Sequence, residues 1–119
     1  MRVVVVTLAL TLVASSAMAV GSATDGQRDF SRCAACHAIK KGSNGIGPSL
    51  ASVVGREAGT ESGYSYSPAM ARVKITWDDA SLDRFLANPQ SVVHGTKMYI
   101  AIPDARQRKD IIAYLNTLK

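Results

Sequence analysis

The chain begins with a continuous apolar run and continues as short amphipathic segments separated by polar loops. A basic start at residues 1–2 precedes Val3–Ala14, which is apolar except for two threonines, and small residues follow up to Ala17-Met18-Ala19. This order is typical of a secretory signal peptide, so we expect residues 1–19 to be removed after Ala19. The alternative is an uncleaved membrane anchor, because residues 3–20 are uncharged and reach the lower limit of about 18 residues for spanning a bilayer.

Residues 20–119 contain two amphipathic segments in their first two thirds. Asp25 is a suitable N-cap for a helix that brings Phe30 and Cys33 to one face at a three-residue spacing. Ser67 followed by Pro68 predicts an N-cap and a proline at the first position of a short helix ending near Arg72.

Two further helices are predicted toward the C-terminus. Asp78 or Asp79 begins one of them, and Pro89 ends it. Asp104 caps the last helix, where Gln107 would complete a capping box. The apolar stripes of these two helices are Leu82, Phe85 and Leu86 in the first, and Ile111, Tyr114, Leu115 and Leu118 in the second.

The rest of the chain has no helical or strand periodicity. Ile39–Gly63 is rich in glycine, and Val92–Ile102 is apolar but irregular. Loops this long are unusual in a small domain unless they wrap around a cofactor. We therefore predict a single all-α domain of about four helices over residues 20–119, with no internal repeat.

The cofactor is suggested by Cys33-Ala34-Ala35-Cys36-His37, which contains the only two cysteines of the chain. On a helix, residues three apart share a face, so both thiols can reach the two vinyl groups of one porphyrin. His37 follows directly and can bind the iron perpendicular to the ring. The motif predicts covalent attachment of one haem c.

Two other interpretations of this motif lack supporting features. A structural zinc site needs four ligands, usually from two such clusters, and the chain has no second cysteine pair. A thioredoxin-like redox pair needs alternating strands and helices, which the pattern does not predict.

The length and the net charge of the chain narrow the range of possible functions. Removal of the signal peptide would leave 100 residues, a size at which a buried porphyrin would supply a large part of the core. The net charge of +5 would fall to +4 without Arg2. The chain has no cluster of lysines and arginines with interleaved aromatic residues, so its sequence does not indicate nucleic-acid binding. A diffuse positive surface suits acidic redox partner proteins instead.

Six further motifs make the chain resemble class I cytochromes c over nearly all of residues 25–119. They occur in the order found in that family: Gly47-Pro48-Ser49-Leu50, Gly63-Tyr64-Ser65-Tyr66, Trp77, Asn88-Pro89, Gly95-Thr96-Lys97-Met98 and Ile112-Ala113-Tyr114-Leu115. The resemblance implies a cytochrome c fold, with long loops wrapped around one covalently bound haem.

The resemblance also implies an axial ligand set of His37 and Met98. A soft thioether favours ferrous iron, so a Met/His pair raises the reduction potential relative to two histidines. Met70, His94 and Lys97 are the other candidates for the sixth position. We expect Met70 to pack near the haem, His94 to lie exposed in a loop, and Lys97 to face solvent.

Other site residues follow from the same resemblance. It implies that the Pro48 carbonyl accepts a hydrogen bond from His37, and that Tyr66 and Trp77 bind a haem propionate. Arg56 would compensate the propionate charge. Phe30 and Tyr114 are expected to pack the first helix against the last.

Three departures from the family distinguish this chain. Ile100 stands where many mitochondrial relatives have an aromatic residue, and Gln90-Ser91 stands where they often have lysines. Met70 replaces a common asparagine. The positive ring around the haem edge is consequently thinner and consists mainly of Arg32, Lys40, Lys41 and Lys97.

The predicted function is that of a soluble, monomeric one-electron carrier in the periplasm. It would exchange electrons with partner proteins such as membrane oxidase or reductase complexes, without stable membrane insertion and without enzymatic activity. One alternative is a small peroxidase with a labile sixth ligand, for which His94 is the only remaining histidine. Another is an electron conduit anchored in the membrane by residues 3–20.

Overall fold

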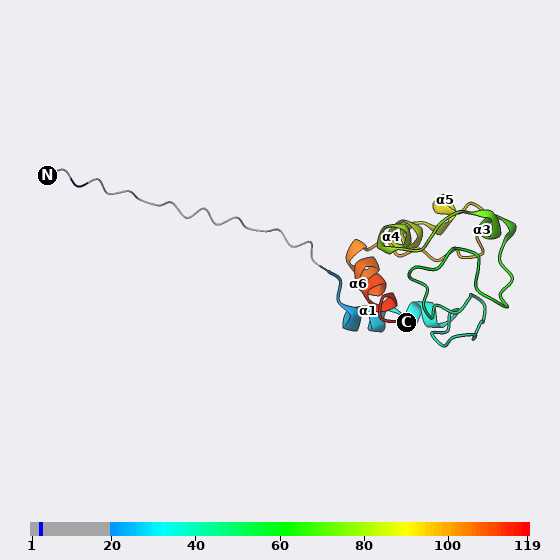
Figure 1. Cartoon of the computed structure of the whole chain (residues 1–119), viewed down its shortest axis with the longest axis horizontal. Helices are drawn as coiled ribbons and strands as arrows, with labels where there is room; N and C mark the ends of the chain where they lie inside the picture. Colours follow the sequence, from blue (N-terminus) through cyan, green and yellow to red (C-terminus); the bar gives the residue numbers. More distant parts are fainter. Residues whose placement is uncertain (1–2, 4–19) are drawn as a thin grey trace.

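The computed structural model describes Val3 and residues 20–119, and in this part of the chain it is all-α, as predicted (Figure 1). The predicted signal peptide lies, apart from Val3, outside the described residues. The described chain has no extended strand, only an isolated antiparallel bridge between Glu57 and Thr76. No helix in it is both long and apolar enough to cross a bilayer. The helices are α1 (Ala23–Asp29), α2 (Ser31–Ala34), α3 (Pro68–Arg72), α4 (Asp79–Ala87), α5 (Pro89–Val92) and α6 (Ala105–Leu115).

The first predicted helix is two helices, and its N-cap is not Asp25. The cap is Ser22, whose hydroxyl accepts a hydrogen bond from the Asp25 amide at 3.2 Å. Serine caps a helix as well as aspartate does. Asp25, in the first turn, still stabilises the helix because its negative charge lies near the positive end of the helix dipole. The chain then turns at Phe30, which separates α1 from α2.

The packing of α1 on α6 brings the two ends of the domain together (Figure 1). The Phe30 and Tyr114 rings meet edge to face, with centroids 5.2 Å apart, which confirms the predicted pair. Gly26 allows the close approach, because a Cβ at this position would collide with the backbone carbonyl of Asp110.

The helices in the middle of the chain largely follow the predictions. Ser67 caps α3, with Pro68 at its first position. Asp78 caps α4 and forms a reciprocal capping box with Ser81. Pro89 does end α4, but it also begins α5, because its ring fixes φ at a helical value. The four predicted helices are therefore six.

The last helix, α6, has Asp104 as its N-cap, as predicted. The Asp104 carboxylate accepts hydrogen bonds from the amides of Arg106 and Gln107. The predicted capping box, in which the Gln107 side chain would accept from the backbone N–H of Asp104, is not among the hydrogen bonds of the described residues. Its apolar residues Ile111, Ile112, Tyr114 and Leu115 are buried.

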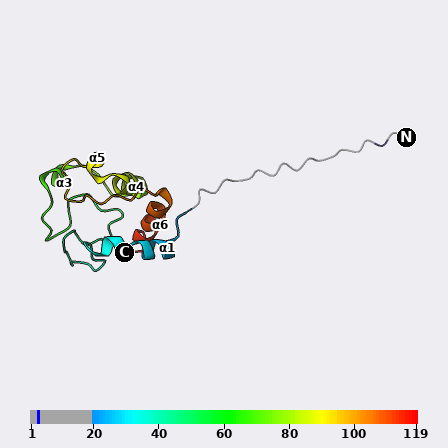
Figure 2. The same ribbon diagram turned by 180° about the vertical axis from the view of Figure 1, so that it is seen from behind.

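The long segment between α2 and α3 has no helix or strand (Figure 2). Its backbone is held in place by hydrogen bonds to other segments. Gly55 and Trp77 are joined by an N–H to carbonyl hydrogen bond of 2.7 Å, and Trp77 donates in turn to Arg56 at 2.9 Å. The Ala58 amide donates to the Ile75 carbonyl at 2.7 Å. These bonds hold the loop against the segment before α4, so that loop and helices enclose one space.

Candidate haem site

A cavity of about 330 Å³ lies between the long loop, α3, α4 and the segment after α5. It brings Cys33, Cys36 and His37 together with Met98, more than half the chain away in sequence. Most of its walls are apolar side chains, including Leu50, Val53, Leu82, Phe85 and Leu86. Such a space suits a large, flat and mainly apolar group.

Cys33 and Cys36 are presented by a single turn of backbone at the end of α2. The amides of Cys36 and His37 both donate to the Cys33 carbonyl, at 3.0 and 2.9 Å. Both cysteines are half-buried free thiols that line the cavity. Burial raises the pKa of the Cys33 thiol, whereas a reactive redox cysteine has a lowered pKa.

The structure of the described residues also argues against the other two interpretations of the motif. A thioredoxin-like pair would require a sheet, and residues 20–119 contain none. A structural zinc site needs four ligands, and the described residues contain no group of even three His, Cys, Asp or Glu side chains that could hold a metal ion.

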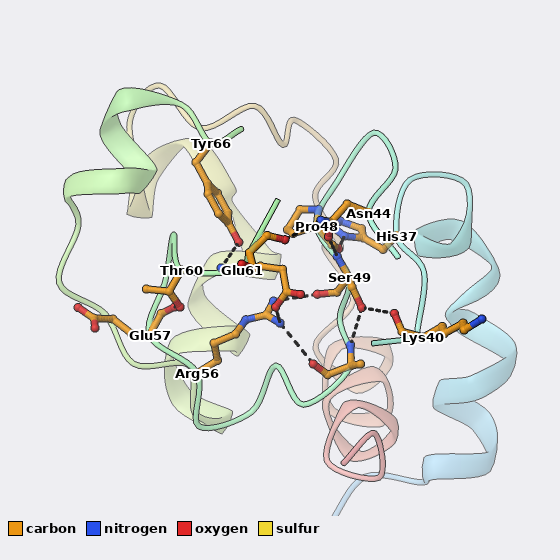
Figure 3. Close-up of polar contacts among 12 residues, drawn as sticks. His37, Lys40, Asn44, Pro48, Ser49, Arg56, Glu57, Thr60, Glu61 and Tyr66 are labelled. Carbon is orange, nitrogen blue, oxygen red and sulfur yellow. Dashed lines mark hydrogen bonds and ion pairs between the residues drawn. The ribbon is translucent and has the colours of Figure 1, made fainter. Parts of the chain in front are cut away.

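His37 is oriented by the loop that follows it. Its Nδ1 lies 2.7 Å from the Pro48 carbonyl oxygen, as the resemblance implied (Figure 3). A carbonyl can only accept, so Nδ1 carries the proton and Nε2 keeps a free lone pair. Burial lowers the pKa of His37, against a smaller opposing effect of the Pro48 hydrogen bond, which favours the neutral imidazole that metal binding requires.

Gly47 makes this arrangement of His37 possible. A Cβ at position 47 would lie 2.7 Å from His37 Nδ1 and still closer to the neighbouring ring carbon. Glycine therefore lets the loop pass directly against the imidazole.

The four candidates for the sixth ligand occupy different places. Met98 is half-buried and lines the cavity. Met70, on α3, also lines the cavity and is buried in the hydrophobic core of the domain. His94 is exposed and is not among the lining residues. Lys97 lies at the rim, where its ammonium donates to the Ser65 carbonyl at 2.6 Å and lies 5.6 Å from the Tyr64 ring centre.

Tyr66 and Trp77, the residues expected to bind a propionate, both line the cavity. The Tyr66 hydroxyl accepts a hydrogen bond from the Glu61 amide at 3.0 Å, which leaves its own proton available for donation (Figure 3). Burial raises the pKa of Tyr66, so this proton is retained at neutral pH. Trp77 is buried and packs on Phe85, with ring centres 5.0 Å apart.

Arg56 also lines the cavity, but its guanidinium already has an anionic partner that the sequence analysis missed. Glu61 lies 2.7 Å from Arg56, and both side chains are more than four-fifths buried (Figure 3). Arg56 also donates to the carbonyls of Ser49 and Ala51, at 2.9 and 3.3 Å. No helical or strand periodicity in the sequence predicts this ion pair, because both residues lie in the irregular loop.

The residues present fit a c-type haem. Two thiols, an imidazole with a free Nε2 and a thioether all line the cavity, and most of its remaining lining is apolar. This donor set of nitrogen and soft sulfur suits haem iron.

Comparison with known proteins agrees with this geometry. The sequence profile of the family described as Cytochrome c matches residues 23–119. Cytochrome c2 iso-2 of Magnetospirillum molischianum is 44% identical over 80% of this chain and 99% of its own length. Cytochrome c of Euglena viridis is 48% identical over 83% of this chain and 99% of its own length. The solved structure of cytochrome cH from Methylobacterium extorquens matches with a TM-score of 0.77 and 44% identity, covering 82% of this chain and 99% of that one.

The chain belongs to the cytochrome c family, in which it is a class I, monohaem protein. It carries one haem c, attached covalently through Cys33 and Cys36. Its function is that of a one-electron carrier, whose iron alternates between the ferric and ferrous states.

Proposed function

We propose that this electron carrier holds its haem iron between His37 and Met98. The observation that carries the proposal is one cavity lined both by an imidazole of defined tautomer and by a thioether, although the two residues lie far apart in sequence. When bound, the haem supplies the redox-active iron. The protein's own contribution is to hold the two ligands and to surround the ring with apolar side chains.

The two ligands have complementary effects on the iron. The hydrogen bond to Pro48 orients His37 and makes its Nε2 a stronger donor. The thioether of Met98 favours the ferrous state and thereby raises the reduction potential. With His37 and Met98 both holding the iron, no site would remain for a substrate, which suits electron transfer without bond chemistry.

We assign the propionate contacts to the hydroxyl of Tyr66 and the indole N–H of Trp77. Both groups line the cavity, and buried aromatic side chains with a polar atom usually find a partner. Arg56 would then share its charge between a propionate and Glu61, which lies 2.7 Å from it.

We further propose that the chain is exported to the periplasm and works there as a monomer. The support is the N-terminal pattern of residues 1–19, which matches a signal peptide cleaved after Ala19. The partners would be donor and acceptor redox proteins, such as membrane oxidase or reductase complexes. The mass of the mature protein tests the cleavage, because retention of residues 1–19 would favour the anchored alternative.

A peroxidase role is the less supported alternative, so we propose that the protein is not an enzyme. Such a reaction needs an acid/base group beside the iron, and His94 is exposed and absent from the cavity lining. Rapid peroxide turnover by the purified ferric protein would contradict this proposal.

The ligand assignment is tested by the absorption spectrum of the ferric protein and of its Met98→Ala variant. We expect the wild type to have the weak red band of sulfur bound to ferric iron. The variant should keep its covalent haem, lose this band, show a lower reduction potential and bind cyanide faster, because the sixth position is open.

Met70→Leu is the matched control, since Met70 is the other methionine of the cavity and leucine has a similar volume. The band should persist in this variant. A red band that survives in Met98→Ala but disappears in Met70→Leu would show that Met70 is the ligand and that our assignment is wrong.

A further inference from the structure

The segment that carries Met98, residues 95–98, belongs to no helix or strand and will be called the methionine loop. Gly95 has a φ of +94°, which allows the chain to turn sharply there. Thr96 is 3% exposed, so its backbone carbonyl needs a partner inside the protein. The loop therefore depends on other groups to keep its conformation.

Three hydrogen bonds to the methionine loop come from a single side chain, Gln90 on α5. Its amide nitrogen donates to the carbonyl oxygens of Thr96 at 2.8 Å and Met98 at 3.3 Å. Its amide oxygen accepts from the Gly95 amide at 3.3 Å. A flipped amide would turn an oxygen toward two carbonyls, so the three contacts together define its orientation.

The short helix α5 provides a firm base for this side chain. Pro89, next to Gln90, is almost completely buried, and α5 packs on the longer helix α4. Asn88 caps α5 by accepting from the Ser91 amide at 3.3 Å. Gln90 thus connects the methionine loop to the packed part of the domain.

We propose that Gln90 is a positioning residue that keeps Met98 on the haem iron. This inference rests on the proposed ligand set. Each opening of the methionine loop, in which Met98 leaves the iron, would break the contacts of Gln90 with the backbone. Those contacts consequently favour the closed state over the open one, without Gln90 touching the haem.

The test compares three variants as haem-loaded, full-length mature proteins. Gln90→Leu keeps similar bulk but forms no hydrogen bonds. Gln90→Glu keeps the shape and the acceptor toward Gly95 but cannot donate to the two carbonyls. Ser91→Ala is the control, because the Ser91 hydroxyl donates to Asn88 within α5 and makes no contact with the methionine loop.

We expect cyanide to bind ferric Gln90→Leu and Gln90→Glu about tenfold faster than the wild type, since at least two hydrogen bonds of ordinary net strength are lost in each. The red band should weaken in both. Ser91→Ala should bind cyanide at the wild-type rate. Denaturant unfolding, measured in parallel, separates loop opening from general destabilisation.

Two results would overturn the proposal while leaving the ligand assignment intact. One is a wild-type rate in Gln90→Glu, which would mean that only the bulk of the side chain matters. The other is an equal acceleration in all three variants. If the wild type itself lacks the red band, the ligand assignment fails, and the role of Gln90 fails with it.

Discussion

At the scale of single residues, the site depends on which side chains are missing as well as on those present. Gly47 contributes no atoms to the haem cavity beyond its backbone, yet the position of His37 depends on it. The imidazole occupies the space in which any other residue would have its Cβ. The orientation of the His37 imidazole, the proposed ligand, thus follows from the smallest residue beside it.

Gly47→Ala should therefore disturb the ligand. The new methyl group has to push the His37 ring or the loop aside, an overpacking effect that costs about 1–3 kcal/mol. We expect a lower free energy of unfolding and an altered spectrum of the ferric haem, because the hydrogen bond to Pro48 is also lengthened. Denaturant titration and absorption spectroscopy measure these effects.

Gly45→Ala is the matched control in the same loop. A Cβ at position 45 would lie 3.3 Å from the Cys36 carbonyl and meet no part of His37. If both variants behave alike, the close approach at Gly47 is not what orients the imidazole.

At the scale of the elements, the capping residues in the sequence predicted well where the helices begin. They predicted less well how many helices the described residues form. Ser67, Asp78 and Asp104 cap the helices they were expected to cap, because a capping side chain acts within three residues. The break between α1 and α2 and the restart at Pro89 were not predicted. Both depend on how short helices pack.

The cap of α4 predicts a pH dependence of stability. The hydrogen bond that the Ser81 amide donates to the Asp78 carboxylate holds the pKa of Asp78 below its ordinary value of 3.8. A carboxyl group whose pKa is lowered by folding stabilises the native state above its ordinary pKa, and this contribution is lost as the pH falls. Asn caps equally well but does not ionise.

Asp78→Asn should therefore be slightly less stable than the wild type at pH 7, and the difference should shrink toward zero as the pH falls below the ordinary carboxyl pKa of 3.8 and Asp78 becomes protonated in the folded protein. Because Asp78 is exposed, the effect should be small. Denaturant unfolding of both proteins from neutral pH to below that pKa measures it. A difference that grows in acid would contradict the proposed origin of the pKa shift.

At the scale of the whole molecule, the haem is part of the core. Leu50, Val53, Leu82, Phe85 and Leu86 line a cavity of about 330 Å³, so without the haem this apolar surface would not be packed against another group. The total stability of a domain is only about 5–15 kcal/mol. The polypeptide alone therefore has little margin.

The double variant Cys33→Ala/Cys36→Ala, which cannot attach haem covalently, should lose cooperative folding when purified without haem. We expect near-ultraviolet circular dichroism to lose its fine structure and thermal unfolding to lose its sharp midpoint. A variant with alanine at both positions that still melts cooperatively would show that the side chains suffice as a core.

Two features of the molecule were determined by the sequence alone. Cys33, Cys36 and His37 act within one turn of backbone, so their spacing already brings two thiols and an imidazole to one place. The caps are equally local. For the same reason the cofactor could be inferred before any fold was known, and the six motifs of the family extended that inference to Met98 and the surrounding residues.

Only the tertiary structure decided the contacts that join irregular segments. These contacts are the Arg56–Glu61 pair, the close approach of Gly47 to His37 and the three bonds of Gln90 to the methionine loop. Each has at least one partner in a loop, where no period relates sequence position to direction. Their geometry depends on how the loops pack around a common space. Residues close in sequence interact because the backbone brings them together, whereas loop residues meet only when the whole chain has folded around its cofactor.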